Sequence, residues 1–319
     1  MGETKISISK ALPKKAFPRK GILYYLKRDA FLYLLLLLPV MYFIVFKYAP
    51  MYSIVIAFQD YNIFAGISGS QWVGLDVFKE IFRSNDFYRA LRNTFLLNGL
   101  DLLFGFPAPI ILAIIINEIK YNKFKKISQT MLYLPHFLSW VIIGGISLQI
   151  FAPNYGLVDN VIKELGFKTI PFLTENWHWV FTYVGIGVWQ SAGWGMIMYL
   201  AAITGINPEL YEAAEVDGAS RLRRIWNITL PCIKSTIIIL FILNVGKISA
   251  ISFDRPYVIG NASVRDFADV ISTYVYRVGL RSSRYNLATA VGLFQSIVSL
   301  VFVSITNYIT NKSGEQGIW

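Results

Sequence analysis

Long apolar runs alternate with short polar segments along most of this 319-residue chain. Six runs reach the length of about 20 residues that an α-helix needs to cross the hydrocarbon core of a bilayer. They lie at residues 30–55, 95–116, 131–151, 179–203, 233–253 and 287–309. The pattern predicts an all-α integral membrane protein, a helical bundle of about six transmembrane helices.

The composition supports a membrane protein over a soluble one. Hydrophobic residues make up 55% of the chain and charged residues only 15%, whereas a soluble domain usually has about 25% charged residues. The 8 Trp, 19 Tyr and 23 Phe suit a protein with both wet and dry surfaces, because amphipathic rings collect at the level of the lipid headgroups.

Basic residues are placed at the ends of the apolar runs rather than in one patch. Eight of the 30 Lys and Arg precede residue 30, and the short connection at residues 118–127 carries four Lys. Cytoplasmic segments of membrane proteins carry such an excess, so both termini are predicted to be cytoplasmic. We expect a tail with an interfacial helix at residues 1–29 and a membrane domain at 30–319. The net charge of +11 is then explained by cytoplasmic segments that flank a membrane, and it does not indicate binding of nucleic acid.

Few residues carry catalytic or metal-binding chemistry. The chain has one cysteine, Cys232, and two histidines, His136 and His178, so no metal site is expected. Gly246-Lys247 lacks the Ser or Thr that follows in a GxxxxGK[ST] phosphate-binding loop. We expect no catalytic residue and no cofactor in this chain, which is not predicted to be an enzyme.

The polar connection at residues 204–231 reads as two short helices around a turn. Asn207 is a good N-cap and Pro208 suits the first helical position. Gly218 can adopt the left-handed conformation that ends a helix, and Ser220 can cap the next one. The small residues of this segment would let the surface of another protein approach its backbone closely. A helical cytoplasmic loop with no partner is the alternative.

The same connection carries a family resemblance. Glu212-Ala213-Ala214, followed by Gly218 and Leu230-Pro231, resembles the EAA loop of the permease subunits of binding-protein-dependent ABC importers. The segments at residues 72–76, 134–137 and 269–277 resemble the carbohydrate-uptake branch, in particular its complex-oligosaccharide subgroup.

This resemblance implies the type I importer permease fold and a mechanism. The loop would dock on a cytoplasmic ATPase, whose ATP-driven closure switches the permease between inward-facing and outward-facing states. The implied ATPase-coupling residues are Tyr211, Glu212, Ala213, Ala214, Asp217, Gly218, Ala219 and Leu222. The implied partners are a second homologous permease subunit, two ABC ATPase subunits that hold ATP and Mg, an extracellular solute-binding protein and an oligosaccharide. The implied location is the bacterial cytoplasmic membrane.

Polar and aromatic residues inside the spans are candidates for the substrate pathway, because polar groups at membrane depth are costly and often face a cavity. The candidates are Gln149, Trp189, Gln190, Trp194, Asn244 and Lys247. Hydrogen bonding between helices is the alternative role for each polar residue.

Arginines are frequent after the fifth apolar run, in a connection that the predicted topology places outside. Arg255, Arg277 and Arg281 are candidates for contact with an acidic patch of the binding protein or with uronate-containing oligosaccharides. Ion pairing with Asp254, Asp266 and Asp269 is the alternative.

Three other functions stay open. A non-sugar solute would suit the same importer architecture. An ion-coupled secondary transporter would need a coupling-ion site, for which Asp101 and Lys247 are the clear charged candidates within the predicted spans. An intramembrane enzyme would need a catalytic arrangement, and the runs show no HExxH motif and no paired Asp on neighbouring spans.

Overall fold

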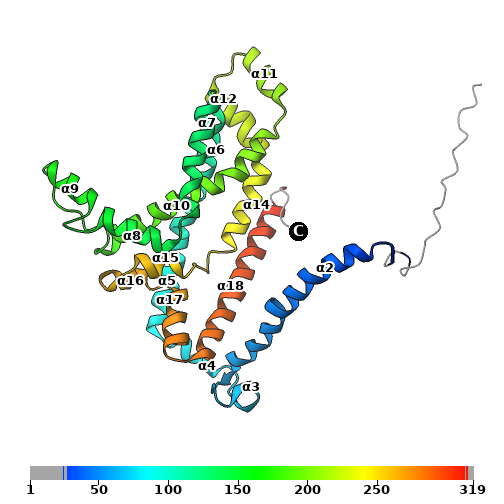
Figure 1. Ribbon diagram of the computed structural model, residues 1–319, viewed down its shortest axis with the longest axis vertical. Coiled ribbons are helices and arrows are strands. Elements are labelled where there is room, and N and C mark those ends of the chain that lie inside the picture. Colours follow the sequence, from blue (N-terminus) through cyan, green and yellow to red (C-terminus); the bar gives the residue numbers. More distant parts are fainter. Residues whose placement is uncertain (1–23, 25–26, 313, 315–319) are drawn as a thin grey trace, which may run out of the picture. The chain divides into compact units, whose positions relative to one another are not determined.

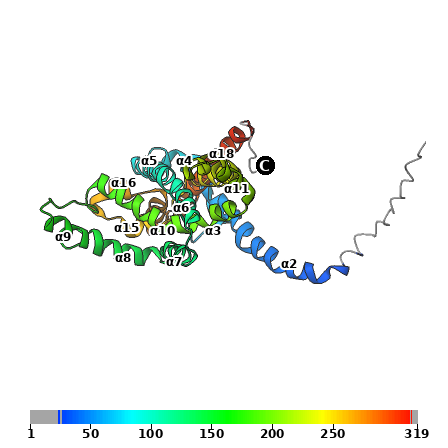
Figure 2. The same ribbon diagram turned by 90° about the horizontal axis from the view of Figure 1, so that it is seen from above.

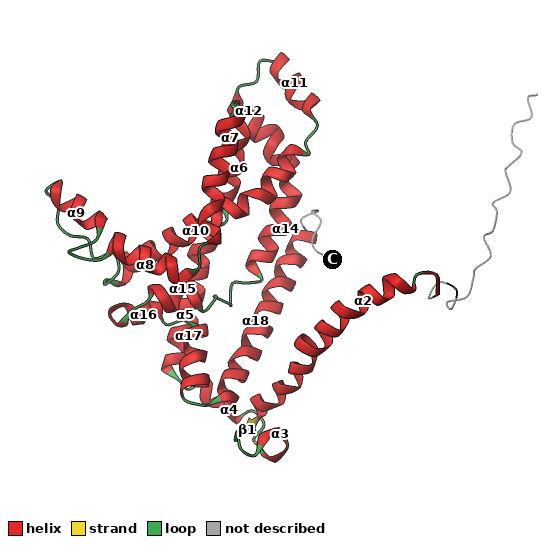
Figure 3. Ribbon diagram, viewed as in Figure 1, coloured by secondary structure: helices red, strands yellow, loops and turns green. Residues whose placement is uncertain are grey.

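The computed structural model describes residues 24, 27–312 and 314, and most of them are helical (Figures 1 and 3). Contacts divide the chain into two units, Met1–Tyr52 and Ser53–Trp319. The predicted interfacial helix falls largely outside the described residues, and the boundary at residue 30 stays a prediction.

The first apolar run forms three consecutive helical segments: α2 (Ala30–Phe43), the π-helix η1 (Ile44–Tyr48) and the 3-10 helix η2 (Ala49–Phe58). No residue of α2 is buried, and its leucines and aromatic residues are exposed. Such an all-round apolar helix suits contact with lipid. A short connection follows, with α3 (Gly66–Gly69) between the paired strands β1 (Gln59–Asp60) and β2 (Gln71–Trp72).

Four helices of the described chain are long and apolar enough to cross a membrane. They are Ala30–Phe58, Asn85–Glu118, Asn176–Thr204 and Tyr285–Lys312. Two further pairs qualify only as broken spans: Asn122–Phe137 with Trp140–Phe151, bent by 103°, and Arg221–Cys232 with Lys234–Val245, bent by 63°. The prediction of an all-α membrane protein is therefore confirmed, with four spans, or the predicted six if each bent pair is one span.

Three π-helical segments follow one rule of sequence. The second span comprises α5 (Asn85–Leu100), the π-helix η3 (Asp101–Gly105) and α6 (Pro107–Glu118), and the π-helix η5 (Ile225–Thr229) lies between α12 (Arg221–Arg224) and α13 (Leu230–Cys232). Each of η1, η3 and η5 ends two residues before a proline: Pro50, Pro107 and Pro231. A proline ring clashes with the carbonyl four residues earlier and removes one hydrogen bond, so the helix widens there.

The third predicted run does not form one straight helix. It is divided into α7 (Asn122–Tyr133), the 3-10 turn η4 (Leu134–Phe137) and α8 (Trp140–Phe151). Pro135 lies in the turn, and Ser139 caps α8 by accepting a hydrogen bond from the Ile142 amide at 3.4 Å. The apolar run continues across this break, so hydropathy alone does not reveal it.

The fifth predicted run also ends earlier than expected. Its helix α14 (Lys234–Val245) stops eight residues before the predicted end at residue 253, and Lys247 lies in the irregular segment that follows. The Asn98 side-chain amide donates to the Ile248 carbonyl at 2.6 Å, which fixes this segment to α5. The backbone between α14 and α15 is therefore irregular rather than helical, and it borders the polar cavity described below.

The remaining elements are short, except the two long spans α10 (Asn176–Thr204) and α18 (Tyr285–Lys312). The short ones are α4 (Asp76–Ile81), α9 (Leu157–Glu164), α11 (Pro208–Val216), α15 (Asp254–Ile259), η6 (Ala262–Val264), α16 (Arg265–Ala268), α17 (Ile271–Val275) and the π-helix η7 (Tyr276–Arg281). Within the second unit, α11 lies at one end and α4 at the other (Figure 1).

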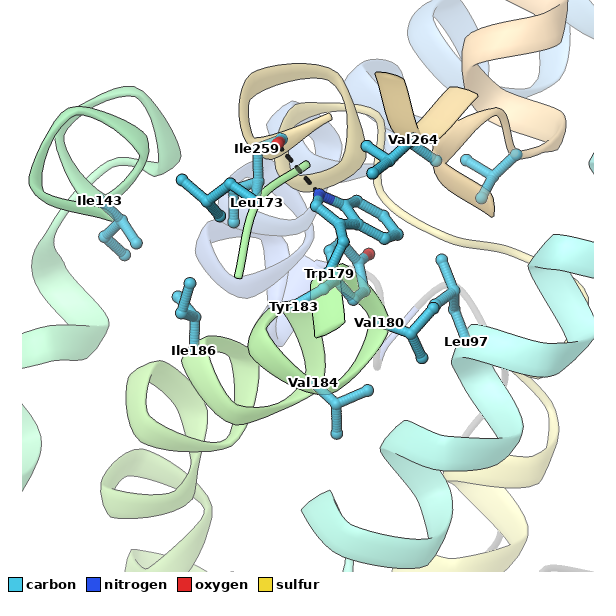
Figure 4. Close-up of a cluster of buried hydrophobic side chains, with 12 residues drawn as sticks. Leu97, Ile143, Leu173, Trp179, Val180, Tyr183, Val184, Ile186, Ile259 and Val264 are labelled. Carbon is cyan, nitrogen blue, oxygen red and sulfur yellow. Dashed lines mark hydrogen bonds between the residues drawn. The ribbon is translucent and has the colours of Figure 1, made fainter. Parts of the chain in front are cut away.

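Helix α10 is the centre of packing in the second unit. It contacts α6 and α7 and the turns next to them (Figure 2). On its other side, Trp179 and Tyr183 are fully buried in a cluster with residues of α5, α8 and α15 (Figure 4). The Trp179 indole donates a hydrogen bond of 3.1 Å to the Ile259 carbonyl. This contact fixes α15, which borders both sites described below.

Close approach of α7 to α10 requires glycine at position 193. A Cβ atom placed there would overlap the Leu132 carbonyl group, whereas a Cβ at Gly185 of the same helix would meet no atom within 4 Å. We expect Gly193→Ala to destabilise the purified protein by about 1–3 kcal/mol, because a packed interface cannot absorb the extra methyl group. Gly185→Ala should be neutral or stabilising, since alanine favours helix. Thermal unfolding in detergent measures both, and equal midpoints would contradict this packing.

Candidate functional site

The helix α11 begins as its sequence predicts. The Asn207 side-chain oxygen accepts a hydrogen bond from the Glu209 amide at 3.1 Å, and Pro208 occupies the first helical position. A cap of this kind satisfies an amide that the helix itself leaves without a partner. The start of α11 is therefore set locally.

The end of α11 is a Schellman turn. Gly218 has a φ of +72°. The Ala219 amide donates to the Ala214 carbonyl at 2.8 Å, and the Gly218 amide donates to the Glu215 carbonyl at 3.1 Å. These are the two hydrogen bonds of that motif, which places glycine in the left-handed conformation. Ser220 then caps α12 by accepting from the Arg223 amide at 3.4 Å.

Two side-chain contacts hold α11 against the next helical segment. The hydroxyls of Tyr211 and Thr229 are 2.9 Å apart, and Thr229 is buried. An Arg224 guanidinium nitrogen lies 3.2 Å from a Glu215 carboxylate oxygen. The turn at Gly218 is thereby fixed between two connected helices.

The outer face of this helix–turn–helix exposes apolar side chains around a centre of small residues. Val216 is 89% exposed, Leu222 70% and Trp226 68%. A Cβ atom at Gly218 would meet nothing within 4 Å. We call this face, formed by α11, the Gly218 turn and α12–η5, the coupling surface. Apolar groups held outward by a rigid turn suit docking of another protein.

The structure brings all eight predicted coupling residues together in this region. Glu212, Ala213, Asp217, Gly218 and Leu222 are exposed, whereas Tyr211, Ala214 and Ala219 are half-buried. Their contact with an ATPase stays a prediction.

A polar cavity of about 300 Å³ lies between η3, α8, α10, the irregular segment after α14, and α15. Its polar lining consists of Asn98, Asp101, Tyr183, Ser191, Asn244, Lys247, Ser252 and Arg255. Trp140 and Phe106 contribute aromatic rings. Cavities with a few polar groups and aromatic walls are typical of small-molecule sites.

An ion pair lies in the wall of this cavity. The Arg255 guanidinium contacts the Asp101 carboxylate at 2.7 Å and 3.2 Å and donates to the Tyr183 carbonyl at 2.5 Å. It also lies over the Tyr183 ring, 3.7 Å from the centroid. The Arg255 side chain is 11% exposed and the Asp101 side chain 27%. A Cβ atom at Gly187 would overlap the guanidinium, so that glycine makes room for it.

Three polar groups of the residues that line the cavity have no partner within the described chain, and two of these groups are buried in its wall. The buried Nε atom of Arg255 and the buried hydroxyl of Tyr183 make no hydrogen bond. No described carboxylate lies within ion-pair distance of the Lys247 ammonium. Because Asp101 neutralises Arg255, Lys247 supplies the uncompensated positive charge of the cavity.

The other predicted pathway residues do not all reach this cavity. Asn244 and Lys247 line it. Trp189 instead lines an apolar hollow between α8 and α10, and Gln149 is exposed on α8. Gln190 donates to the His136 carbonyl at 3.4 Å. Trp194 stacks on the His136 ring, with centroids 4.7 Å apart.

The three predicted arginines lie in different environments in the structure. The expectation that Arg255 lies on an outer surface is wrong, because this side chain is buried against Asp101 in the cavity. Arg277 pairs with Asp269 at 2.7 Å and with Asp86 at 3.1 Å. Burial alone would lower the pKa of Arg277, but these carboxylates raise it above its ordinary value.

Arg281 keeps an exposed guanidinium, which lies 5.3 Å from the centre of the Tyr276 ring. Arg284, in the same connection, donates two hydrogen bonds to Glu80 and lowers the pKa of that carboxyl.

Sequence reasoning missed two parts of the cavity. Tyr183 and Ser191 face it from α10, but both lie in an apolar run with no distinguishing spacing. Asp101 did give a signal, because a carboxylate within a span needs a positive partner. That partner is 154 residues away in the sequence.

Comparisons with known proteins agree with this arrangement. Residues 105–313 match a family described as "Binding-protein-dependent transport system inner membrane component". The chain is 44% identical over 294 residues to the Protein LplB of Bacillus subtilis strain 168, with 92% of each chain covered. It is 44% identical over 301 residues to the polygalacturonan/rhamnogalacturonan transport system permease protein YteP of the same strain, with 94% of each covered.

Solved structures give the same result. A chain of a bacterial ABC transporter involved in the import of the acidic polysaccharide alginate is 41% identical, with a TM-score of 0.84 and coverage of 91% of this chain and 98% of that one. A second structure of an alginate ABC transporter, in complex with an alginate pentasaccharide-bound periplasmic protein, has a chain that is 40% identical with a TM-score of 0.85. It covers 93% of this chain and 99% of that one.

Proposed function

The chain belongs to the family of inner membrane components of binding-protein-dependent transport systems, and from this premise we propose that it is a permease subunit of an ATP-driven ABC importer for acidic oligosaccharides. The observation that carries the importer assignment is the coupling surface, an exposed docking face with a locally fixed turn at Gly218. A chain without its own nucleotide-binding loop requires such a face to receive energy from a partner.

The substrate class is supported by relatives and by charge. YteP is named for polygalacturonan and rhamnogalacturonan transport, and two solved structures concern alginate import. Within the polar cavity, Lys247 provides a positive charge with no internal counter-ion, and Asn244 and Ser191 provide hydrogen-bonding groups. A uronate residue, which carries one carboxylate and several hydroxyls, matches this lining.

The proposed assembly has several subunits. A second homologous permease would complete the pathway. Two ATPase subunits would hold ATP and Mg, and one of them would dock on the coupling surface. An extracellular binding protein would deliver the oligosaccharide. In this arrangement both termini and the coupling surface face the cytoplasm, in agreement with the lysines at residues 118–127.

Competition for uptake tests the substrate class. Cells that express the complete transporter take up a labelled oligogalacturonate in the presence of an unlabelled competitor. We expect unesterified oligogalacturonates, which carry ionised carboxylates, to compete at about the concentration of the labelled sugar. A neutral oligosaccharide of equal length should need a concentration at least about tenfold higher, because it lacks the charge-assisted hydrogen bonds. Equal competition by both sugars would contradict the acidic substrate class.

A further inference from the structure

A second hollow of about 360 Å³ lies on another side of α15, between that helix and the α17–η7 segment. We call it the outer groove. Tyr257 and Tyr276 line it together with Arg265, Arg281 and Asn261. Arg255, two residues before Tyr257 on the same short helix, lines the polar cavity instead. One helix thus borders both hollows.

Packed aromatic rings form one wall of the outer groove. The Tyr257 and Tyr276 centroids are 5.6 Å apart at 76°. Phe253 packs against both: its ring stacks on Tyr257 with centroids 4.5 Å apart and is tilted against Tyr276 with centroids 4.9 Å apart. Three mutually packed rings hold an aromatic surface in place at low cost in conformational entropy.

Charges around the outer groove do not balance. Asp269 and Asp86 are occupied by Arg277 and Arg89, and the Asp269 side chain is only 7% exposed. Among the described residues, neither Arg265 nor Arg281 has a carboxylate within ion-pair distance, and both are exposed. The Arg281 guanidinium lies over the Tyr276 ring. The outer groove therefore offers uncompensated positive charge beside aromatic faces.

We propose that the outer groove is a saccharide subsite, in which Arg281 binds the carboxylate of a uronate residue while Tyr257 and Tyr276 pack on its pyranose ring. The volume lies at the lower end of the range of about 300–1,000 Å³ for ligand pockets, which suits a short segment of the sugar chain. A planar guanidinium matches a carboxylate in two parallel hydrogen bonds. The groove would hold the acidic chain next to the polar cavity.

The features of the groove favour a sugar over a docked protein. Arg265 and Arg281 line one open hollow together with Tyr257 and Tyr276, and Asn261 and Thr273 add hydrogen-bonding groups to the same space. The faces of a pyranose ring are C–H surfaces and its edge carries hydroxyls, so both kinds of group find a partner there.

The test uses the complete transporter in proteoliposomes and rests on the proposed function. Uptake is measured as a function of the concentration of loaded binding protein, once with trigalacturonate and once with its methyl ester. We expect Arg281→Gln to raise the half-saturating concentration about tenfold for the acid and to leave the ester nearly unchanged. Arg281→Lys should lie between, because it keeps the charge but not the paired hydrogen bonds.

Matched controls separate the outcomes. Lys168→Gln removes an exposed cation elsewhere on the predicted outer side and should leave the half-saturating concentration for both sugars unchanged. Unchanged uptake of the ester by Arg281→Gln shows that this variant is folded. Equal losses for both sugars, with weaker binding of the sugar-free binding protein, would make Arg281 a docking residue and overturn the proposal.

If Arg281→Gln keeps the wild-type preference for the acid over the ester, the proposed subsite in the outer groove is overturned, while the proposed function is not. Indifference of the wild-type transporter to the carboxylate would overturn the proposed substrate class as well.

Discussion

Gly218→Asn is expected to reduce ATPase stimulation and sugar uptake by roughly 20- to 30-fold, the effect of losing about 2 kcal/mol at the centre of an interface. Asparagine tolerates the left-handed conformation that Gly218 adopts at a φ of +72°. A Cβ atom there meets no atom of this chain within 4 Å, so the permease itself should fold normally. The added side chain would instead occupy the space of a docked ATPase.

Two measurements make this prediction specific. The ATP hydrolysis of the reconstituted complex is compared with the amount of ATPase subunit that copurifies with the permease. A matched change, Gly166→Asn, introduces asparagine at another glycine of positive φ with open space around it, in the connection after α9, and should leave both values unchanged. If Gly218→Asn shows wild-type ATP hydrolysis and a wild-type amount of copurifying ATPase subunit, the coupling surface is not the ATPase contact.

Removing one partner of the Arg255–Asp101 ion pair is expected to destabilise the permease by about 3 kcal/mol. Arg255→Met leaves the Asp101 carboxylate, whose side chain is 27% exposed, without its counter-charge, and an uncompensated charge inside a protein is costly. The guanidinium also joins η3 to α10 through the Tyr183 carbonyl. Thermal unfolding in detergent measures the loss, and uptake should fall with it.

The double variant Asp101→Leu/Arg255→Met supplies the control. Replacing both charges by apolar groups leaves no buried charge unpaired, so we expect it to recover most of the stability lost in Arg255→Met. A double variant as unstable as the single one would show that the arginine acts through its hydrogen bond to α10 rather than through the ion pair. An unchanged single variant would contradict the role of the pair in the wall of the polar cavity.

Local sequence signals predict the coupling surface well. The cap at Asn207, the turn at Gly218 and the cap at Ser220 each depend on residues within a few positions. Such short-range chemistry can be read without knowledge of the rest of the fold. The apolar runs likewise predict the number of spans, because the thickness of the bilayer sets their length.

The sequence does not reveal where the spans break or which charges meet. Hydropathy continues across the bend at Pro135 and past the end of α14 at Val245. The pairing of Arg255 with Asp101 joins positions 154 residues apart and depends on the packing of α15 against α10. The same packing separates Arg255 from Arg281, although the two arginines share one connection in the sequence.

ATP dependence of transport tests the central claim most directly. The permease is reconstituted in proteoliposomes with its partner permease, the ATPase subunits and the loaded binding protein, and internal ATP is varied. We expect acidic oligosaccharide uptake only when both ATP and the ATPase subunits are present, and no ATP hydrolysis by this chain alone. Uptake that persists without the ATPase subunits and follows an ion gradient would contradict the account and indicate a secondary transporter.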